Sequence, residues 1–179
     1  MHLATRLFSI SIFILTCSCF AQCKKNNNAS ISDNPYGLPN ATQTGAGAFA
    51  CRINGENFIA RNDIDHINGV LRNDTIGIGG SFLVGNFFDI ISIGIYGNLK
   101  AGSVYGFSDT IHTSCLFGTD STCQAIVSVT TIYPRIGSII LTKLDTINKI
   151  ISGTFNIKIP IPQCDTLNVT DGRFDYQYN

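Results

Sequence analysis

Tryptophan is absent from this chain of 179 residues, and glutamate occurs once, as Glu56. Glutamate is a favoured residue on exposed helix surfaces, so its near absence argues against long exposed helices. Aspartate must then supply almost every carboxylate, which narrows the choice of paired catalytic acids. Basic and acidic residues balance at 12 each. Because no positive excess is available to hold phosphates, we expect no nucleic-acid partner.

Several motifs of common active sites are also missing. The chain contains no G-x-S-x-G nucleophile elbow, and the glycine-rich segment 77–82 is not followed by the helical pattern of a phosphate or dinucleotide site. A Ser/His/Asp triad assembled from distant residues stays open as an alternative, since its members need not be neighbours in sequence. From these patterns we predict no catalytic residue, no metal ligand and no cofactor.

The first 22 residues have the pattern of a bacterial export signal. His2 and Arg6 precede the apolar run 7–15 (LFSISIFIL), and small residues follow it. The run is shorter than the roughly 20 apolar residues that a transmembrane helix needs. A buried N-terminal strand is the alternative, but two lysines and an asparagine run end the apolar pattern abruptly. We expect a water-soluble body after export, because no later run is long enough to cross a membrane.

Three cysteines near the end of this signal are candidates for lipid attachment. A lipoprotein signal ends at a cysteine that follows a small residue, with an aliphatic residue shortly before it. Cys19 fits this pattern best, Cys23 directly precedes the polar segment, and Cys17 ranks third. The alternative is cleavage after Ala21, which would give a secreted or periplasmic protein without lipid. Several acyl chains on one cysteine would make the membrane a stable partner.

The rest of the chain divides into a tether and a domain. Residues 23–45 are mainly Lys, Asn, Ser, Asp, Pro and Gly, with too few apolar side chains to offset the entropy lost on ordering. We therefore predict a lipoprotein-type signal at 1–22, a flexible polar tether at 23–45 and a single β domain at 46–179. A domain of this size buries roughly two thirds of its unfolded surface.

Alternation of apolar and polar residues, rather than helical spacing, dominates this domain. Phe155, Ile157 and Ile159, for example, alternate with polar residues. Turn signals recur at intervals of about 8 to 12 residues, which is typical of a sandwich or barrel. The prediction is an all-β fold: an antiparallel β-sandwich or partly closed barrel of about nine or ten strands, with little helix.

Specific turns and bends can also be predicted. Asn54-Gly55 and Asn68-Gly69 favour two-residue hairpin turns, because both residue types tolerate positive φ. Asp171-Gly172 is a further turn signal. The glycines within two of the strands indicate bulges or bends. The strands predicted after the tether are 49–53, 56–60, 63–67, 70–74, 74–82, 87–97, 125–133, 137–145, 149–159 and 166–178.

Four cysteines follow the tether: Cys51, Cys115, Cys123 and Cys164. Export places them in an oxidising compartment, where disulfides are the default state. Four cysteines allow three pairings. We favour Cys115–Cys123, because the Gly-Thr-Asp-Ser segment between them is turn-forming, which leaves Cys51–Cys164. A zinc site is the alternative, but the spacing of these cysteines is not that of zinc ligands.

Three stretches together resemble a family of short Bacteroidota lipoproteins of unknown function. They are 41–60, 141–157 and 169–178, which carry an A-T-Q-T-G entry, a C-x-V-N-G-like hairpin, a D-T-x-N-K turn before S-G-T-F, and a closing T-D-G-R-F-D. The resemblance implies export and anchoring at the outer membrane, facing the periplasm or the cell surface, and it implies no activity. Phe58 stands where relatives often carry tryptophan. Relatives commonly acylate the cysteine directly before the lysines, which favours Cys23.

A second resemblance concerns O-glycosylation. In the same bacterial group the modified motif is Asp-Ser/Thr followed by an aliphatic residue, Ala, Met or Thr. This chain has five matches, where its composition gives about one by chance. The alternative is that aspartate opens turns and β-branched residues open strands, so that such tripeptides recur in any β-rich chain. The candidate hydroxyls belong to Thr75, Thr110, Ser121, Thr146 and Thr166.

Two further clusters have less specific patterns. Asp63, Asp65 and His66 fall short of a calcium loop, because the spacing of ligands and glycine does not match, so we interpret them as a solvated strand face. His112 lies three residues before Cys115, but a Cys–His nucleophile pair would need a reduced thiolate, and an exported chain favours the disulfide.

The sequence therefore favours an exported, lipid-anchored cell-envelope domain that acts as a binding or structural module, with a glycan or an envelope protein as partner. Exposed aromatic residues would line a carbohydrate groove, although core positions are the commoner role. One alternative is an envelope hydrolase whose site is assembled from loops. Another is an assembly accessory that pairs an exposed strand edge with a partner.

Overall fold

A computed structural model describes residues 36–60, 67–84, 87–118, 134–160 and 165–178. These residues belong to one compact unit that runs from Asn34 to Asn179. The predicted signal at 1–22, the first part of the predicted tether and the lipidation candidates Cys17, Cys19 and Cys23 lie outside the described residues. In the described ranges all regular elements are β-strands, and no helix long and apolar enough to span a membrane occurs there.

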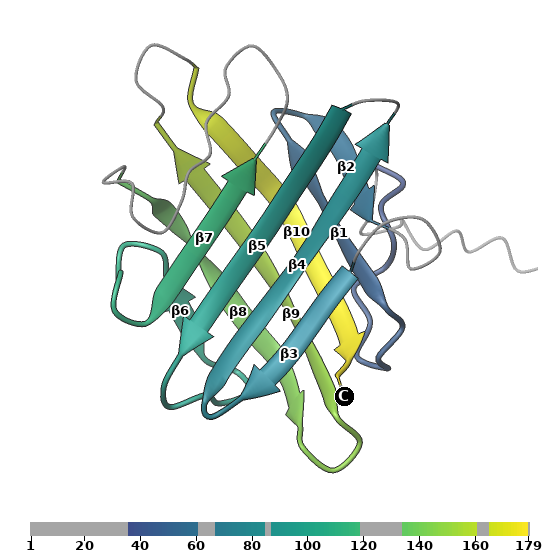
Figure 1. Ribbon diagram of the computed structural model, residues 1–179, viewed down its shortest axis with the longest axis vertical. Helices are drawn as coiled ribbons and strands as arrows, with labels where there is room; N and C mark the ends of the chain where they lie inside the picture. Colours follow the sequence, from purple (N-terminus) through teal and green to yellow (C-terminus); the bar gives the residue numbers. More distant parts are fainter. Residues whose placement is uncertain (1–35, 61–66, 85–86, 119–133, 161–164, 179) are drawn as a thin grey trace, which may run out of the picture. The chain divides into compact units, whose positions relative to one another are not determined.

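Ten strands form two antiparallel sheets in this part of the chain (Figure 1). The six-stranded sheet has the order β2-β1-β10-β9-β8-β6, and the four-stranded sheet has the order β3-β4-β5-β7. Both sheets are open, so the predicted antiparallel sandwich is confirmed and the fold is not a closed barrel. The strands are β1 (Ala48–Ile53), β2 (Glu56–Ala60), β3 (Ile67–Arg72), β4 (Thr75–Val84), β5 (Phe87–Tyr96), β6 (Val104–Gly106), β7 (Thr113–Gly118), β8 (Ile136–Asp145), β9 (Ile150–Ile159) and β10 (Leu167–Gln177).

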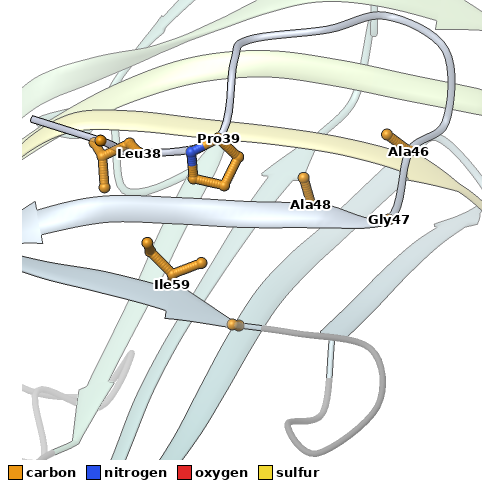
Figure 2. Close-up of a pocket in the computed structure, with 8 residues that line it drawn as sticks. Leu38, Pro39, Ala46, Gly47, Ala48 and Ile59 are labelled. Carbon is orange, nitrogen blue, oxygen red and sulfur yellow. The ribbon is translucent and has the colours of Figure 1, made fainter. Parts of the chain in front are cut away.

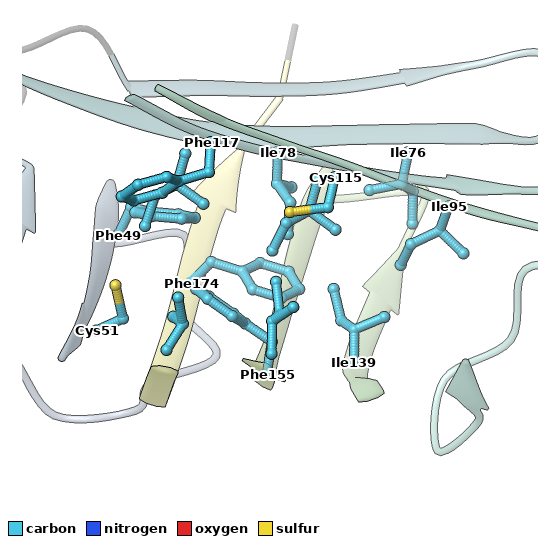
Figure 3. Close-up of a cluster of buried hydrophobic side chains, with 14 of the residues drawn as sticks. Phe49, Cys51, Ile76, Ile78, Ile95, Cys115, Phe117, Ile139, Phe155 and Phe174 are labelled. Carbon is cyan, nitrogen blue, oxygen red and sulfur yellow. The ribbon is translucent and has the colours of Figure 1, made fainter. Parts of the chain in front are cut away.

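The core lies between the two sheets and is built from the alternating apolar residues (Figure 3). The four-stranded sheet contributes isoleucines of β4 and β5, such as Ile78 and Ile93, which are buried. The six-stranded sheet contributes aromatic rings, and Phe49 of β1 stacks on Phe155 of β9 with 5.3 Å between ring centroids. Tyr176 of β10 donates a 2.9 Å hydrogen bond to the Gly79 carbonyl of β4, which links the two sheets through the core.

Of the two predicted hairpin turns, Asn54-Gly55 is confirmed and Asn68-Gly69 is wrong. Asn54 and Gly55 have φ of 50° and 93° and join β1 to β2. Asn68-Gly69 lies inside β3, and the chain turns instead at Asn73-Asp74. Gly69 faces the core, where an added Cβ would come within 2.7 Å of Tyr176 Cγ. This glycine is needed for packing rather than for turning.

The other glycine predictions also need correction. Asp171-Gly172 is not a turn but a bulge inside β10, where the pairing with β9 shifts between Val169 and Gly172. The glycines of β4 and β5 mark no bulge, since these strands pair without a register shift along their whole length. Gly80 instead makes room for the opposite sheet, because an added Cβ would come within 2.8 Å of Phe49 and Ala60.

Two strands were not predicted and two predictions remain without a test. Both β6 and β7 fall in a stretch to which the sequence assigned no strand. The predicted strand 125–133 lies outside the described residues, as does nearly all of the predicted strand 63–67, including Asp63, Asp65 and His66.

Candidate functional site

The segment from Tyr36 to Gly47 forms an arm that lies on the outer face of the six-stranded sheet. The Tyr36 ring stacks on Arg52 of β1, with 3.8 Å from the guanidinium carbon to the ring centroid. The Pro39 carbonyl accepts a 3.0 Å hydrogen bond from Arg173 of β10. Farther along, Lys143 of β8 donates to the carbonyl of Gln43. Residues 36–45, which the sequence assigned to a flexible tether, are therefore ordered against the domain.

Asp175 of β10 is the residue on which the second half of the arm closes. The residue is 1% exposed, and its carboxylate accepts six hydrogen bonds, of which five come from the arm. Within the arm, the Thr42 hydroxyl donates at 2.6 Å and the backbone amides of Thr44, Gly45 and Ala46 donate at 2.8 to 3.1 Å. Ser152 of β9 donates at 2.6 Å from the sheet below. This set of contacts is called the Asp175 clamp below.

The clamp has a clear electrostatic consequence. Burial alone would raise the pKa of Asp175, but hydrogen bonds from Ser152, Thr42 and the arm amides outweigh it and hold the pKa far below its ordinary value. The carboxylate is thus kept ionised by neutral donors. With all of these donors directed at it, Asp175 has a structural role rather than that of an acid or a base.

Local sequence explains how the arm reaches the clamp. Gly45 and Gly47 have φ of 77° and 68°, values that favour glycine, and they turn the chain from the arm into β1. The residues of the clamp come from 41-ATQTGAG-47, 152-SGTF-155 and 173-RFD-175, which fall in the three stretches noted in the sequence. Residues of these three motifs lie together in the structure, where their hydrogen bonds hold the arm against the six-stranded sheet.

Two Asp-Thr-Ile tripeptides form the same turn. Asp109 accepts hydrogen bonds from the amides of Ile111 and His112, and its other oxygen contacts His112 Nδ1 at 2.7 Å. Asp145 repeats this pattern with the two amides that follow Thr146 and with the side chain of Asn148. Hydrogen bonds from the side chains of His112 and Asn148 lower the pKa of the respective carboxyl groups.

These turns decide how the O-glycosylation candidates are presented. Thr110 and Thr146 are exposed, and the isoleucine after each of them is also exposed, by 78% and 90% respectively. Thr75 is half-buried at the start of β4, and Thr166 is exposed just before the buried Leu167. Ser121 lies outside the described residues.

The Asp109–His112 pair is the nearest approach to a catalytic arrangement in the described ranges. Both side chains are about half exposed. Ser114, two residues along β7, shares a 2.8 Å hydrogen bond with the Tyr96 hydroxyl. No hydrogen bond joins Ser114 to His112 among the described contacts, so the geometry is not that of an assembled triad.

Cys51 and Cys115 are buried in the core, and neither forms a disulfide with another residue of the described ranges. Burial, together with the neighbouring Cys115, raises the pKa of Cys51, and burial raises the pKa of Cys115 to about 12. Their predicted partners, Cys164 and Cys123, lie outside the described residues, so the two disulfides stay predictions. Within the ranges that the structure covers, no group of three or more His, Cys, Asp or Glu could hold a metal ion.

A shallow pocket of about 540 Å³ lies between the arm and the first hairpin (Figure 2). Ala48 of β1 lies between Ile59 of β2 on one side and Leu38 and Pro39 of the arm on the other. The described residues that line it are all apolar: Gly37, Leu38, Pro39, Ala46, Gly47, Ala48, Ile59 and Ala60. No sequence pattern predicts this pocket, because one of its walls comes from residues 37–39 of a segment that was predicted to be flexible.

Comparison with known proteins gives no relative for this chain. No protein-family model, no curated protein and no solved structure matches it.

Proposed function

We propose that this chain is an exported protein of the bacterial cell envelope, anchored at the outer membrane by a lipid on an N-terminal cysteine, and that its β-sandwich is a binding or structural module. The observation that supports a binding or structural module is the Asp175 clamp. The most buried carboxylate of the described residues is saturated by six hydrogen bonds that fasten the arm. Export and anchoring are supported by the signal pattern at 1–22.

Metabolic labelling with a palmitate analogue tests the anchor. The wild-type chain should carry the label and sediment with membranes. Substitution of one cysteine should abolish both, with Cys19→Ser the first candidate, Cys23→Ser the second and Cys17→Ser the third. An unlabelled wild-type chain whose mature N-terminus follows Ala21 would show a secreted or periplasmic protein instead.

O-glycosylation is a second part of the proposal, and the turns suggest an order among the candidates. Thr110 and Thr146 present the whole tripeptide to solvent, so a transferase would reach them without disturbing the core. Thr75 and Thr166 are followed by buried residues and should be poorer acceptors. The intact mass of the native protein should exceed that of the polypeptide by hexose units and should fall in a T110A/T146A variant. An unmodified mass would remove this part of the proposal.

An envelope hydrolase is the alternative that one observation favours. Asp109 and His112 are paired at 2.7 Å, as a base and the group that orients it would be. The hydroxyl of Ser114, the serine nearest to His112 in sequence, is however hydrogen-bonded to the Tyr96 hydroxyl. A His112→Ala variant that abolishes a measurable esterase or amidase activity of the native protein would support the hydrolase over the binding module.

A further inference from the structure

β10 is the last of the ten described strands in chain order, yet it lies in the middle of the six-stranded sheet (Figure 1). One edge of β10 pairs with β1 and the other edge pairs with β9, and both pairings are antiparallel. β1 and β9 therefore run in the same direction on either side of β10. Because each antiparallel ladder needs the strand between them, the β1–β2 hairpin and the β8–β9 hairpin join into one sheet only when β10 is in place.

The side chains of β9 and β10 fit each other in the observed register. Phe174 of β10 lies opposite Gly153 of β9, where an added Cβ would come within 2.5 Å of the Phe174 ring. Phe155 of β9 lies opposite Gly172 of β10, where an added Cβ would come within 2.5 Å of the Phe155 ring. Each ring thus occupies space that a glycine leaves free. These two reciprocal pairs specify where β10 binds along β9.

β10 also holds the arm and the opposite sheet. Asp175 accepts the hydrogen bonds of the Asp175 clamp, five of which come from the arm. Tyr176 donates across the core to the Gly79 carbonyl of β4, and its ring lies against Gly69 of β3. The arm, the first hairpin, the β8–β9 hairpin and the four-stranded sheet are therefore all joined through residues 167–177.

We propose that β10 enters the sandwich as the last step of folding, so that the chain stays open until residues 167–177 have been synthesised and released. The preceding hairpins form from local contacts, whereas the clamp joins residues up to 133 positions apart, and contacts of such separation form slowly. A chain that crosses a membrane in unfolded form must not fold before export, and this order of assembly delays folding. The proposal rests on the export part of the proposed function.

Stalled translation of the full chain tests this order. The chain is extended by a flexible linker and stalled on the ribosome, so that a short linker keeps residues 167–177 inside the exit tunnel and a long linker frees them. A lysine-specific protease then reports folding by cleavage at Lys143 of β8 and Lys158 of β9. We expect cleavage about tenfold slower with the long linker, because proteolysis follows the population of open chains. Equal rates at the two linker lengths would overturn the proposal.

A synthetic peptide of residues 165–178, which contains no lysine, separates the missing strand from an effect of the ribosome. Added to the short-linker chain, it should bind between β1 and β9 and slow the cleavage. The same peptide with Phe174→Asp is the matched control and should have no effect, because a charged side chain would replace the ring opposite Gly153. If neither peptide or both peptides slow the cleavage, the proposal is wrong. These outcomes do not depend on the signal pattern at 1–22, so failure here is distinguishable from failure of export.

Discussion

At the scale of single residues, Asp175 determines where the N-terminal part of the domain lies. A buried carboxylate without partners costs several kcal/mol, and here six donors remove that cost. Five of the six belong to the arm, so the charge is stable where it is only while the arm is in place. The residue and the arm stabilise each other.

Replacing Asp175 with asparagine should destabilise the domain. The amide removes the charge and turns an NH2 group toward donors, so we expect a loss of about 3 kcal/mol in the free energy of unfolding. Urea denaturation followed by circular dichroism measures it. Asp165→Asn, an exposed aspartate just before the same strand, is the control and should change the free energy little. Equal stability of the two variants would contradict the role of the clamp.

The same carboxylate predicts a pH dependence. Its pKa is lower in the folded than in the unfolded state, so its contribution is complete above the unfolded value of about 3.9 and is lost as the pH falls through the folded value. Wild-type stability should therefore fall below about pH 4. In the Asp175→Asn variant, the free energy of unfolding should fall less steeply as the pH is lowered. If the two proteins show parallel acid unfolding curves, this prediction is wrong.

At the scale of strands and turns, local signals could be predicted and packing requirements could not. Asn54-Gly55 forms the predicted turn because both residues adopt positive φ, and the hydrogen bonds of Asn54 to Asn168 of β10 are compatible with that turn. Asn68-Gly69 carries the same signal, yet Gly69 is required opposite Tyr176, a residue more than a hundred positions later. The sequence pattern is identical in the two places, and the tertiary contact decides.

Two glycines in paired strands provide a direct test of this difference. Gly69→Ala should cost about 1–3 kcal/mol, because the new methyl group would overlap Tyr176. Gly77→Ala should be neutral or stabilise by up to about 1 kcal/mol, since an added Cβ meets nothing within 4 Å and alanine loses less backbone entropy. Thermal unfolding of both variants would measure the contrast. A larger loss for Gly77→Ala would contradict the packing described.

The Asp-Thr-Ile turn between β8 and β9 gives a second test at this scale. Asp145→Ala removes the acceptor of three hydrogen bonds in an exposed turn, and should lower the denaturation midpoint. Thr146→Ala should be close to neutral, because its hydroxyl is exposed and makes none of these bonds. The two denaturation midpoints can be compared directly. An equal effect would mean that the threonine, rather than the aspartate, shapes the turn.

At the scale of the whole molecule, alternation was enough to predict an antiparallel sandwich and most of its strands. The alternation of apolar and polar residues did not predict β7. In this strand Thr113, Ser114 and Cys115 are buried in succession, so the sequence lacks a clear period of two. It also missed the arm, because the composition of residues 36–45 is that of a flexible segment. Thr42 finds its partner 133 residues away, and no local pattern reports such a contact.

Amide hydrogen exchange measured by mass spectrometry tests the central claim, that Asp175 fastens the arm to the outer face of the sandwich. In the wild-type protein the amides of Thr44, Gly45 and Ala46 should exchange slowly, because each donates to the carboxylate. In Asp175→Asn they should exchange fast while β4 and β5 stay protected. Fast exchange of these three amides in the wild type, at a pH where the sandwich is folded, would contradict the account.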